Sequence, residues 1–161
     1  MLPGHARMQI AEHERFMRLA LCEALRSGSR GDVPVGAVVV ASGQVLARAG
    51  NEKEWRQDPT AHAEMLALRE AAAKLRTWRL TEVTVYSTME PCFMCAGALL
   101  QARVARVVYA VDDPKWGAAG SVLDLLRAPF VNHRVEVVRG VLAEEVAAAL
   151  AEFFGKLRSA E

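Results

Sequence analysis

Residues 83–101 read VTVYSTMEPCFMCAGALLQ, a β-branched run that changes into an alanine- and leucine-rich segment. VTVYS, residues 83–87, predicts a strand, and Pro91 predicts the start of a helix that occupies the rest of the stretch. Cys92 and Cys95 lie three residues apart at the start of this helix, where side chains at i and i+3 share a face. The stretch therefore predicts a strand–helix unit that brings two sulfur atoms to one point.

The remaining segments are predicted from the same periodicities. Helices are expected at about 11–26, from Asp58 as a cap and Pro59 in the first turn to about 75, near 122–127 and at 143–157. Strands are expected at about 35–40, 45–49, 105–111 and 135–138. After the first hairpin, strands and helices alternate, which implies parallel pairing and helices on both faces of a sheet. The predicted fold is α/β, a three-layer α/β/α arrangement with a central five-stranded mixed sheet flanked by helices.

Composition limits the range of functions only weakly. A chain of 161 residues is long enough for one domain with a real core, which we expect at 11–161 behind a flexible N-terminal tail at 1–10. The net charge of +1 points to no nucleic-acid, membrane or acidic partner. No apolar run reaches the roughly 18 residues of a membrane span, and the first residues lack the apolar stretch of a signal peptide. We therefore expect no membrane association.

The chain has three cysteines, an odd and low number that does not suit a disulfide framework. Reduced thiols suit the cytosol, so a cytoplasmic location is expected. Cys22 lies among apolar residues in a predicted helix and is expected in the core. Cys92 and Cys95 lie at a helix N-terminus, where free N–H groups and the helix dipole favour a thiolate.

Two such thiolates are compatible with a metal site, a redox pair or two buried structural cysteines. A thioredoxin-like redox motif would follow an early strand, and a dithiol site has no need of an upstream His-x-Glu. Structural cysteines are the least specific interpretation, and the placement of the pair behind Pro91 argues against it. The spacing alone leaves all three alternatives open.

The segment TAHAEML, residues 60–66, provides the best third metal ligand. If two helix N-termini meet at the carboxyl edge of the strands, His62 can share one ion with Cys92 and Cys95. Three ligands leave the fourth tetrahedral position open for water, as in catalytic zinc sites, and Glu64 could then act as a proton shuttle. A structural zinc site would need a fourth ligand. His13 is expected at a solvated helix start, and His133, in a loop, could be a ligand but is not indicated by its spacing.

The chain resembles a known family at this point. HAE at 62–64 and PCFMC at 91–95 match the H-x-E and P-C-x-x-C signature of the zinc nucleobase deaminases. NEKEWRQDPTAHAEMLALR, TMEPCFMCAGALLQARVARVVYA, DDPKWGAAGSVLDLL and NHRVEV are similar to the bacterial tRNA-specific adenosine deaminases. The resemblance extends from about residue 11 to the final helix.

This resemblance implies a cytidine deaminase-like fold and a zinc-dependent hydrolase. The family deaminates adenosine to inosine at the wobble position, the first anticodon nucleotide, of transfer RNA. It implies one Zn²⁺ per subunit, a homodimer, and the transfer RNA anticodon stem-loop as partner. The implied zinc ligands are His62, Cys92 and Cys95, the implied general acid/base is Glu64, and the implied substrate contacts are Pro34, Asn51, Ala63, Asp113 and Asn132.

Some positions depart from the family pattern. Met89 replaces a frequent leucine, Trp116 is bulkier than expected in its loop, and the last helix, with Lys156 and Arg158, is less basic than expected. Three alternatives share the motif residues: a free nucleobase or nucleoside deaminase acting on cytosine, deoxycytidylate or guanine, a zinc-stabilised binding module, and a dithiol oxidoreductase. An assay for ammonia release from RNA and from free bases separates them.

Overall fold

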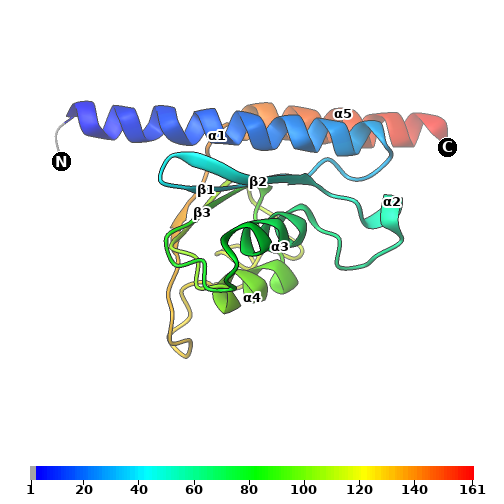
Figure 1. Ribbon diagram of the computed structural model, residues 1–161. Coiled ribbons are helices and arrows are strands. Elements are labelled where there is room, and N and C mark those ends of the chain that lie inside the picture. Colours follow the sequence, from blue (N-terminus) through cyan, green and yellow to red (C-terminus); the bar gives the residue numbers. More distant parts are fainter. Residues whose placement is uncertain (1–2) are drawn as a thin grey trace.

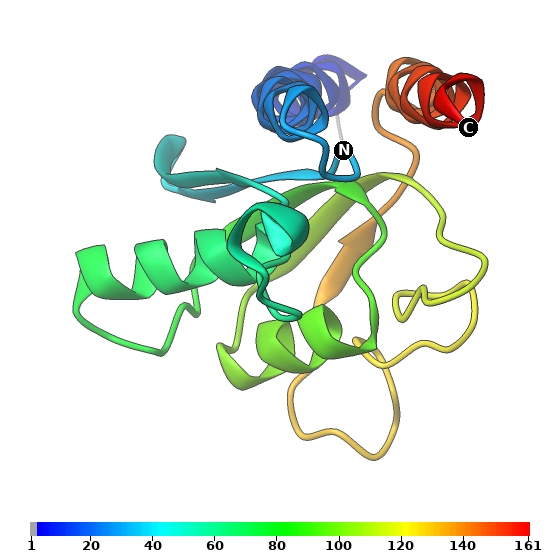
Figure 2. The same cartoon turned by 90° about the vertical axis from the view of Figure 1, so that its right-hand side faces the viewer.

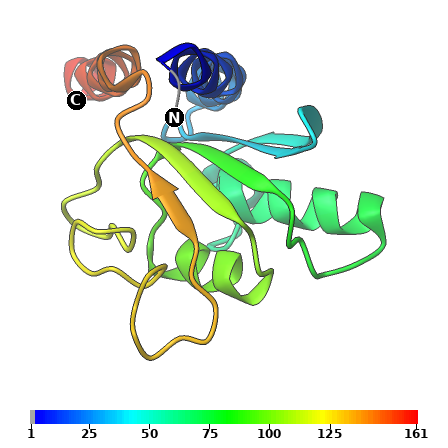
Figure 3. The same cartoon turned by 90° about the vertical axis from the view of Figure 1, so that its left-hand side faces the viewer.

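The computed structural model describes residues 3–161, whose centre is one five-stranded sheet with the strand order β2-β1-β3-β4-β5. The strands are β1 (Gly36–Ala41), β2 (Gln44–Gly50), β3 (Thr84–Met89), β4 (Arg106–Val111) and β5 (Glu136–Val138). β1 is antiparallel to both β2 and β3, whereas β3, β4 and β5 are parallel (Figure 3). The predicted mixed sheet is confirmed.

Helices cover both faces of this sheet (Figures 1 and 2). α1 (Pro3–Ser29) and α5 (Ala143–Ala160) lie side by side on one face, and α3 (Ala63–Leu75) and α4 (Phe93–Gln101) lie on the other. The short helix α2 (Lys53–Arg56) follows β2 and projects from the end of the sheet. The three-layer α/β/α architecture is therefore confirmed.

The central strands are buried on both faces, which explains their continuous valine runs. Val39, Val85 and Val107 belong to the core beneath α3 and α4. Val38 and Val108 belong to the separate core beneath α1 and α5. Successive side chains alternate between the two faces, so one short strand contributes to both layers.

Two glycines allow α1 to lie directly on the β1–β2 hairpin. Gly36 and Gly50 face each other across the two strands. A Cβ atom on Gly36 would lie 1.9 Å from the carbonyl oxygen of Ala20, and one on Gly50 would lie 2.1 Å from Ser27 Oγ. The helix therefore approaches the strands at a distance that no residue with a side chain would permit.

Within the segment 1–10, which the sequence predicts as a flexible tail, α1 is helical from Pro3 onward. The first two residues lie outside the described part of the chain. Two interpretations of residues on α1 were wrong. His13 is buried with its Nδ1 atom 2.8 Å from the Tyr86 hydroxyl, and Cys22 is exposed instead of lying in the core.

Two further element predictions were wrong. No helix starts at Asp58, whose carboxylate instead accepts hydrogen bonds from the backbone and hydroxyl groups of Thr60 and closes a turn. Asp is favourable in both settings, so local sequence did not distinguish them. The segment 122–127 has no helix and is held by a bridge between Ala119 and Asp124. Within residues 3–161, no helix combines the length and apolarity needed to cross a membrane.

Candidate metal and catalytic site

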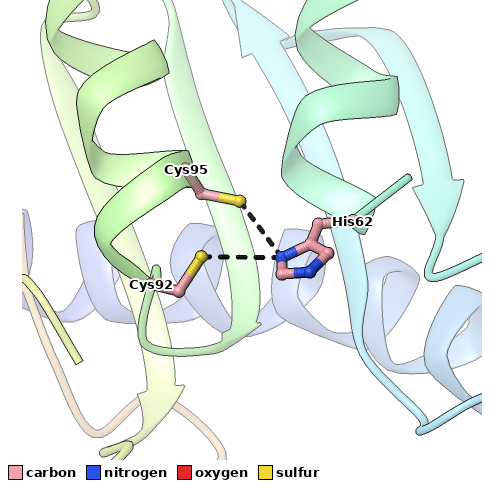
Figure 4. A group of neighbouring side chains, drawn as sticks. All are labelled: His62, Cys92 and Cys95. Carbon is pink, nitrogen blue, oxygen red and sulfur yellow. Dashed lines mark hydrogen bonds between the residues drawn. The ribbon is translucent and has the colours of Figure 1, made fainter. Parts of the chain in front are cut away.

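The three predicted metal ligands come from the starts of two helices that cover the same face of the sheet. His62 is the residue immediately before α3, with an extended backbone at φ −73° and ψ 151°. Cys92 has the same place before α4, and Cys95 lies in the first turn of that helix. Their three side chains point toward one another (Figure 4). The sheet thus joins two motifs that are separated by about one helix and one strand of sequence.

The geometry of this group suits zinc. His62 Nδ1 lies 3.5 Å from the Sγ atoms of both Cys92 and Cys95, and the three ligand atoms lie within 4.8 Å of one another. Tetrahedral zinc, with bonds of about 2.0 Å to nitrogen and 2.3 Å to sulfur, needs N–S separations of about 3.5 Å. One imidazole and two thiolates also form the nitrogen and sulfur ligand set that zinc prefers. The residues therefore fit the ion that the motif predicts.

Electrostatics at the two thiols favour a negative charge in the site. A hydrogen bond from Cys95, together with the nearby His62, lowers the pKa of Cys92 to about 4. The same hydrogen bond and burial raise the pKa of Cys95, since its proton is shared with the Cys92 thiolate. The hydrogen bond with Cys92 also raises the pKa of His62. A divalent cation would satisfy the charge that the three ligands concentrate here.

Glu64 lies beside this group, in the first turn of α3, and is only 4% exposed. Burial raises the pKa of its carboxyl group to about 7, against the opposing effect of the nearby His62 charge. A carboxyl group with a pKa near neutrality can both accept and donate a proton at physiological pH. Glu64 thus has the properties of a general acid/base.

A cavity of about 560 Å³ opens onto His62, Glu64 and Cys92, and we refer to it as the site cavity. Its volume is in the range of small-molecule sites and is sufficient for a purine base. Its other walls come from the α1–β1 loop, the start of α2, the end of β3, the loop after β4 and the C-terminal part of α5. Two of the three candidate metal ligands, His62 and Cys92, therefore line a pocket, whereas Cys95 is fully buried.

The structure brings some of the predicted substrate residues to this cavity. Asn51, Ala63 and Asp113 line it. The Asn51 amide donates a hydrogen bond to the carbonyl of Val33, and its oxygen accepts one from the backbone N–H of Lys53. Asn51 thus holds together two segments of the cavity wall.

The other two predicted substrate residues lie elsewhere among the described residues. Pro34 is buried and does not line the site cavity, although its neighbours Val33 and Val35 do. Asn132 accepts a hydrogen bond from Arg103 and lines a different cavity, behind the end of α4.

Sequence reasoning missed Glu90, which organises the wall formed by the loop after β4. Its buried carboxylate accepts hydrogen bonds from the backbone N–H groups of Asp113, Ala119 and Ser121 and from the Ser121 hydroxyl. Burial opposes ionisation of Glu90, but these hydrogen bonds prevail and lower its pKa. The one available signal was a carboxylate at the end of an apolar strand, directly before Pro91 and Cys92.

Asp32 and helix α5 are further contributors that the sequence did not reveal. The buried Asp32 carboxylate accepts hydrogen bonds from the backbone N–H groups of Glu54 and Trp55 and so anchors α2. Phe153 and Leu157 from α5 line the site cavity. The sequence predictions for this helix concerned only its basic residues and did not include its apolar contribution.

The structure places three of the residues that differ from the family pattern. Trp116 lines the site cavity, is 59% exposed, and lies with its ring centroid 5.5 Å from that of Phe93. Met89 also lines the site cavity. Lys156 forms an ion pair with Glu152 on the exposed surface of α5.

Comparisons with known proteins agree with this geometry. The model of the MafB19-like deaminase family matches residues 11–158. The tRNA-specific adenosine deaminase of Bacillus subtilis is 46% identical over 149 residues, which cover 92% of each chain. A solved structure from a study of A-to-I editing by tRNA:A34 deaminases superposes with a TM-score of 0.81 at 42% identity, covering 84% of this chain and 98% of that one.

A more distant likeness is to the guanine deaminase of Nitrosomonas europaea, with a TM-score of 0.77 at 25% identity and coverage of 87% of this chain and 83% of that one. Sequence identity thus favours the tRNA-acting relatives, at 46% and 42% against 25% for the guanine deaminase. Together with the His62, Cys92 and Cys95 group, these matches establish that the chain belongs to the family of tRNA-specific adenosine deaminases, within the MafB19-like deaminases.

Proposed function

We propose that the protein hydrolyses adenosine to inosine at the wobble position of transfer RNA. The observation that carries this proposal is that His62 and Cys92, two of the three ligands that lie close together, line the site cavity together with the buried Glu64. The family relationship then selects the substrate, because the 46% identical relative is a tRNA-specific adenosine deaminase.

In this proposal His62, Cys92 and Cys95 hold one zinc ion per subunit. When bound, zinc supplies a hydroxide nucleophile at neutral pH, because it lowers the pKa of a water molecule to about 7. The three ligands leave the fourth tetrahedral position for that water, which distinguishes this arrangement from a four-ligand structural site.

Glu64 moves the protons of the reaction. It accepts a proton from the attacking water and delivers it to N1 of adenine while the C6–O bond forms. It then takes the proton of the new C6 hydroxyl group and passes it to the amine, so that the C6–N bond breaks and ammonia leaves. Adenosine and water are thereby converted to inosine and ammonia. A group in this role must be charged for one transfer and neutral for the next, as a carboxyl group can be.

The other residues of the site cavity hold the target nucleotide. An anticodon loop is single-stranded, so turning one base out of the loop costs only a few kcal/mol. Asn51, Ala63 and Asp113 are the residues from which we expect contacts with this nucleotide, because they line the site cavity. Pro34 and Asn132 remain proposed contacts by family resemblance alone, Pro34 through the wall that its neighbours form and Asn132 with flanking nucleotides.

The assembly and location belong to the same proposal. A homodimer and the transfer RNA anticodon stem-loop as partner follow from the family relationship. A cytoplasmic location suits both the RNA substrate and three free cysteines, of which Cys22 is exposed.

The test is to sequence transfer RNA after incubation with the purified, zinc-loaded protein. We expect an A-to-I change, read as A-to-G, at the first anticodon position of a transfer RNA that carries adenosine there. Free adenosine, cytidine and guanine are assayed in parallel for ammonia release. Turnover of a free base without any change in the RNA would refute the proposal in favour of a free-base deaminase.

A further inference from the structure

A second cavity, of about 420 Å³, lies between the C-terminal end of α1, the strand β2, the helix α2 and the first half of α3. We refer to it as the arginine cleft. The charged residues that line it are Arg26, Arg30, Arg48, Arg56 and Arg69, together with Glu23, Glu52 and Glu70. Five arginines against three glutamates leave two excess positive charges in one cleft, whereas the whole chain has a net charge of +1.

Two of the glutamates are each shared between two arginines. Glu23, whose side chain is 7% exposed, lies 3.4 Å from Arg26 and 3.0 Å from Arg48. Glu52 pairs in the same way with Arg30, at 3.5 Å, and with Arg56. A guanidinium group has five N–H donors, so these shared pairs leave donors unused. The glutamates thus hold the arginines in place without neutralising them.

Arg69 carries the unshared charge of the cleft. It is exposed on α3, and within residues 3–161 no carboxylate lies within 4.0 Å of its guanidinium group. Its neighbour Glu70 pairs with Lys74, at 2.9 Å, on the same helix. An arginine that is free to bind an anion bidentately therefore lies beside arginines that are paired with shared glutamates.

The arginine cleft adjoins the site cavity along a shared wall. Neighbouring residues of the same segment line the two spaces in turn. Glu52 lines the cleft, whereas Asn51 and Lys53 line the site cavity. Arg30 lines the cleft, and the next residue, Gly31, lines the site cavity. The helix α2, which extends this wall, faces the viewer in Figure 2. A nucleic-acid strand with one nucleotide in the site cavity can therefore cross the wall into the cleft.

An exposed aromatic side chain lies in α2, which directly follows this wall in the sequence. Trp55 in α2 is 64% exposed, and the Arg30 guanidinium lies 5.4 Å from the centroid of its ring. An exposed indole beside a cationic cleft is typical of surfaces that bind single-stranded nucleic acid, where bases stack on rings and phosphates pair with cations.

We propose that the arginine cleft binds backbone phosphates of the RNA substrate that lie beyond the two nucleotides flanking the target, with Arg69 and Arg30 as its main contacts. This inference rests on the proposed function, because it takes the RNA as the ligand. The cleft reads no base, since phosphate contacts give affinity and register without sequence information. It explains how a protein of nearly neutral net charge can hold a polyanion.

The experiment measures binding and turnover separately. Fluorescein-labelled anticodon stem-loop is titrated with zinc-loaded protein between about 50 and 200 mM salt, and the dissociation constant is read from fluorescence anisotropy. The variants are Arg69→Gln, which breaks no ion pair, and Arg30→Gln/Arg69→Gln. Arg7→Gln/Arg18→Gln is the matched control, because Arg7 and Arg18 are exposed on α1 and line neither cavity. Inosine formation is assayed on the stem-loop and on a trinucleotide centred on adenosine.

We expect the double variant to weaken stem-loop binding about tenfold and to reduce the slope of log K against log salt by about 1 to 2, since each lost phosphate contact removes about 0.7 to 0.9. Trinucleotide turnover should stay unchanged, because so short a substrate occupies only the site cavity. Stem-loop affinity and salt slope equal to those of the control would overturn the proposal, as would an equal loss on the trinucleotide. A wild-type protein that binds the stem-loop but forms no inosine would refute the proposed function and leave the binding test valid.

Discussion

His62 and Glu64 are two residues apart, yet they serve one site from different backbone conformations. Two positions within a helix point about 200° apart, so both side chains could not face a common centre from inside α3. The structure resolves this because His62 precedes the helix in an extended conformation and Glu64 lies in its first turn. The boundary of the helix is therefore part of the site.

The assignment of the metal ligands predicts that replacing Cys95, but not Cys22, abolishes zinc binding. Cys95→Ala removes one of the three ligands and should abolish stoichiometric zinc binding together with turnover. Cys22→Ala is the matched control, because Cys22 is exposed on α1 and takes no part in the group. Zinc content is measured by elemental analysis after dialysis. A Cys95→Ala protein that retains zinc as well as the control would contradict the assignment.

His13 predicts a pH dependence of stability. Burial, and then the positive charge of Arg106, lowers its pKa below the ordinary value of 6.5. The unfolded chain therefore binds a proton at this residue before the folded protein does. The contribution of His13 is fully present above pH 6.5 and is lost as the pH falls from 6.5 through the folded pKa.

Denaturant unfolding between pH 8 and pH 5 measures this effect. The quantity to compare is the slope of the free energy of unfolding against pH in the wild type and in His13→Gln. The zinc site is the same in both proteins and cancels in the comparison. We expect stability to fall less steeply on acidification in His13→Gln. Parallel curves would show that His13 is not the titrating group.

At the scale of elements, the contact between α1 and the β1–β2 hairpin predicts a strong effect of a single methyl group. Gly36→Ala places a Cβ atom against the backbone of Ala20 and Ala24, at 1.9 and 2.6 Å, where no flexible side chain can move aside. We expect a loss of about 3 kcal/mol or more in the free energy of unfolding.

Gly155→Ala in α5 provides the matched control, because a Cβ atom there meets nothing within 4 Å. In a helix this change should be neutral or stabilise by up to about 1 kcal/mol. Both variants are compared by denaturant unfolding. Equal stability of the two would mean that the helix does not approach the hairpin as closely as the structure indicates.

Elements with a strong local pattern were predictable from sequence, and those held by distant contacts were not. The strands β1, β3 and β4 are buried runs of β-branched residues, and α4 follows Pro91, so each was found to within about two residues. The loop after β4 has no comparable pattern. Its conformation depends on Glu90, some 23 to 31 residues away, which no local signal connects to it.

The site divides in the same way. The spacing of Cys92 and Cys95 and the His-x-Glu motif predicted the metal group, because chemistry demands those residue types. The apolar wall supplied by Phe153 and Leu157 could not be predicted, since it depends on α5 lying beside the end of α1. Pro34 and Asn132 were inferred from resemblance, and neither lines the cavity.

At the scale of the whole molecule, the proposed homodimer predicts the mass in solution. Light scattering coupled to size exclusion should give twice the 17.6 kDa of one chain at micromolar concentration. Several large apolar side chains, among them Leu75 at the end of α3 and Trp78 after that helix, are exposed in the single chain, as expected if a partner covers some of them. A mass of 17.6 kDa would contradict the dimer.

The central claim is that Glu64 transfers the protons of the reaction, beside a zinc ion held by His62, Cys92 and Cys95, in a cavity that binds the target nucleotide of the RNA. The most direct test is inosine formation at the first anticodon position of an adenosine-bearing stem-loop by zinc-loaded Glu64→Gln, with Glu54→Gln as the matched loss of an exposed carboxylate in the same cavity. The account predicts unchanged zinc content in both variants, near-normal activity in Glu54→Gln, and a rate at least about 100-fold lower in Glu64→Gln. Near-normal inosine formation by Glu64→Gln would contradict it.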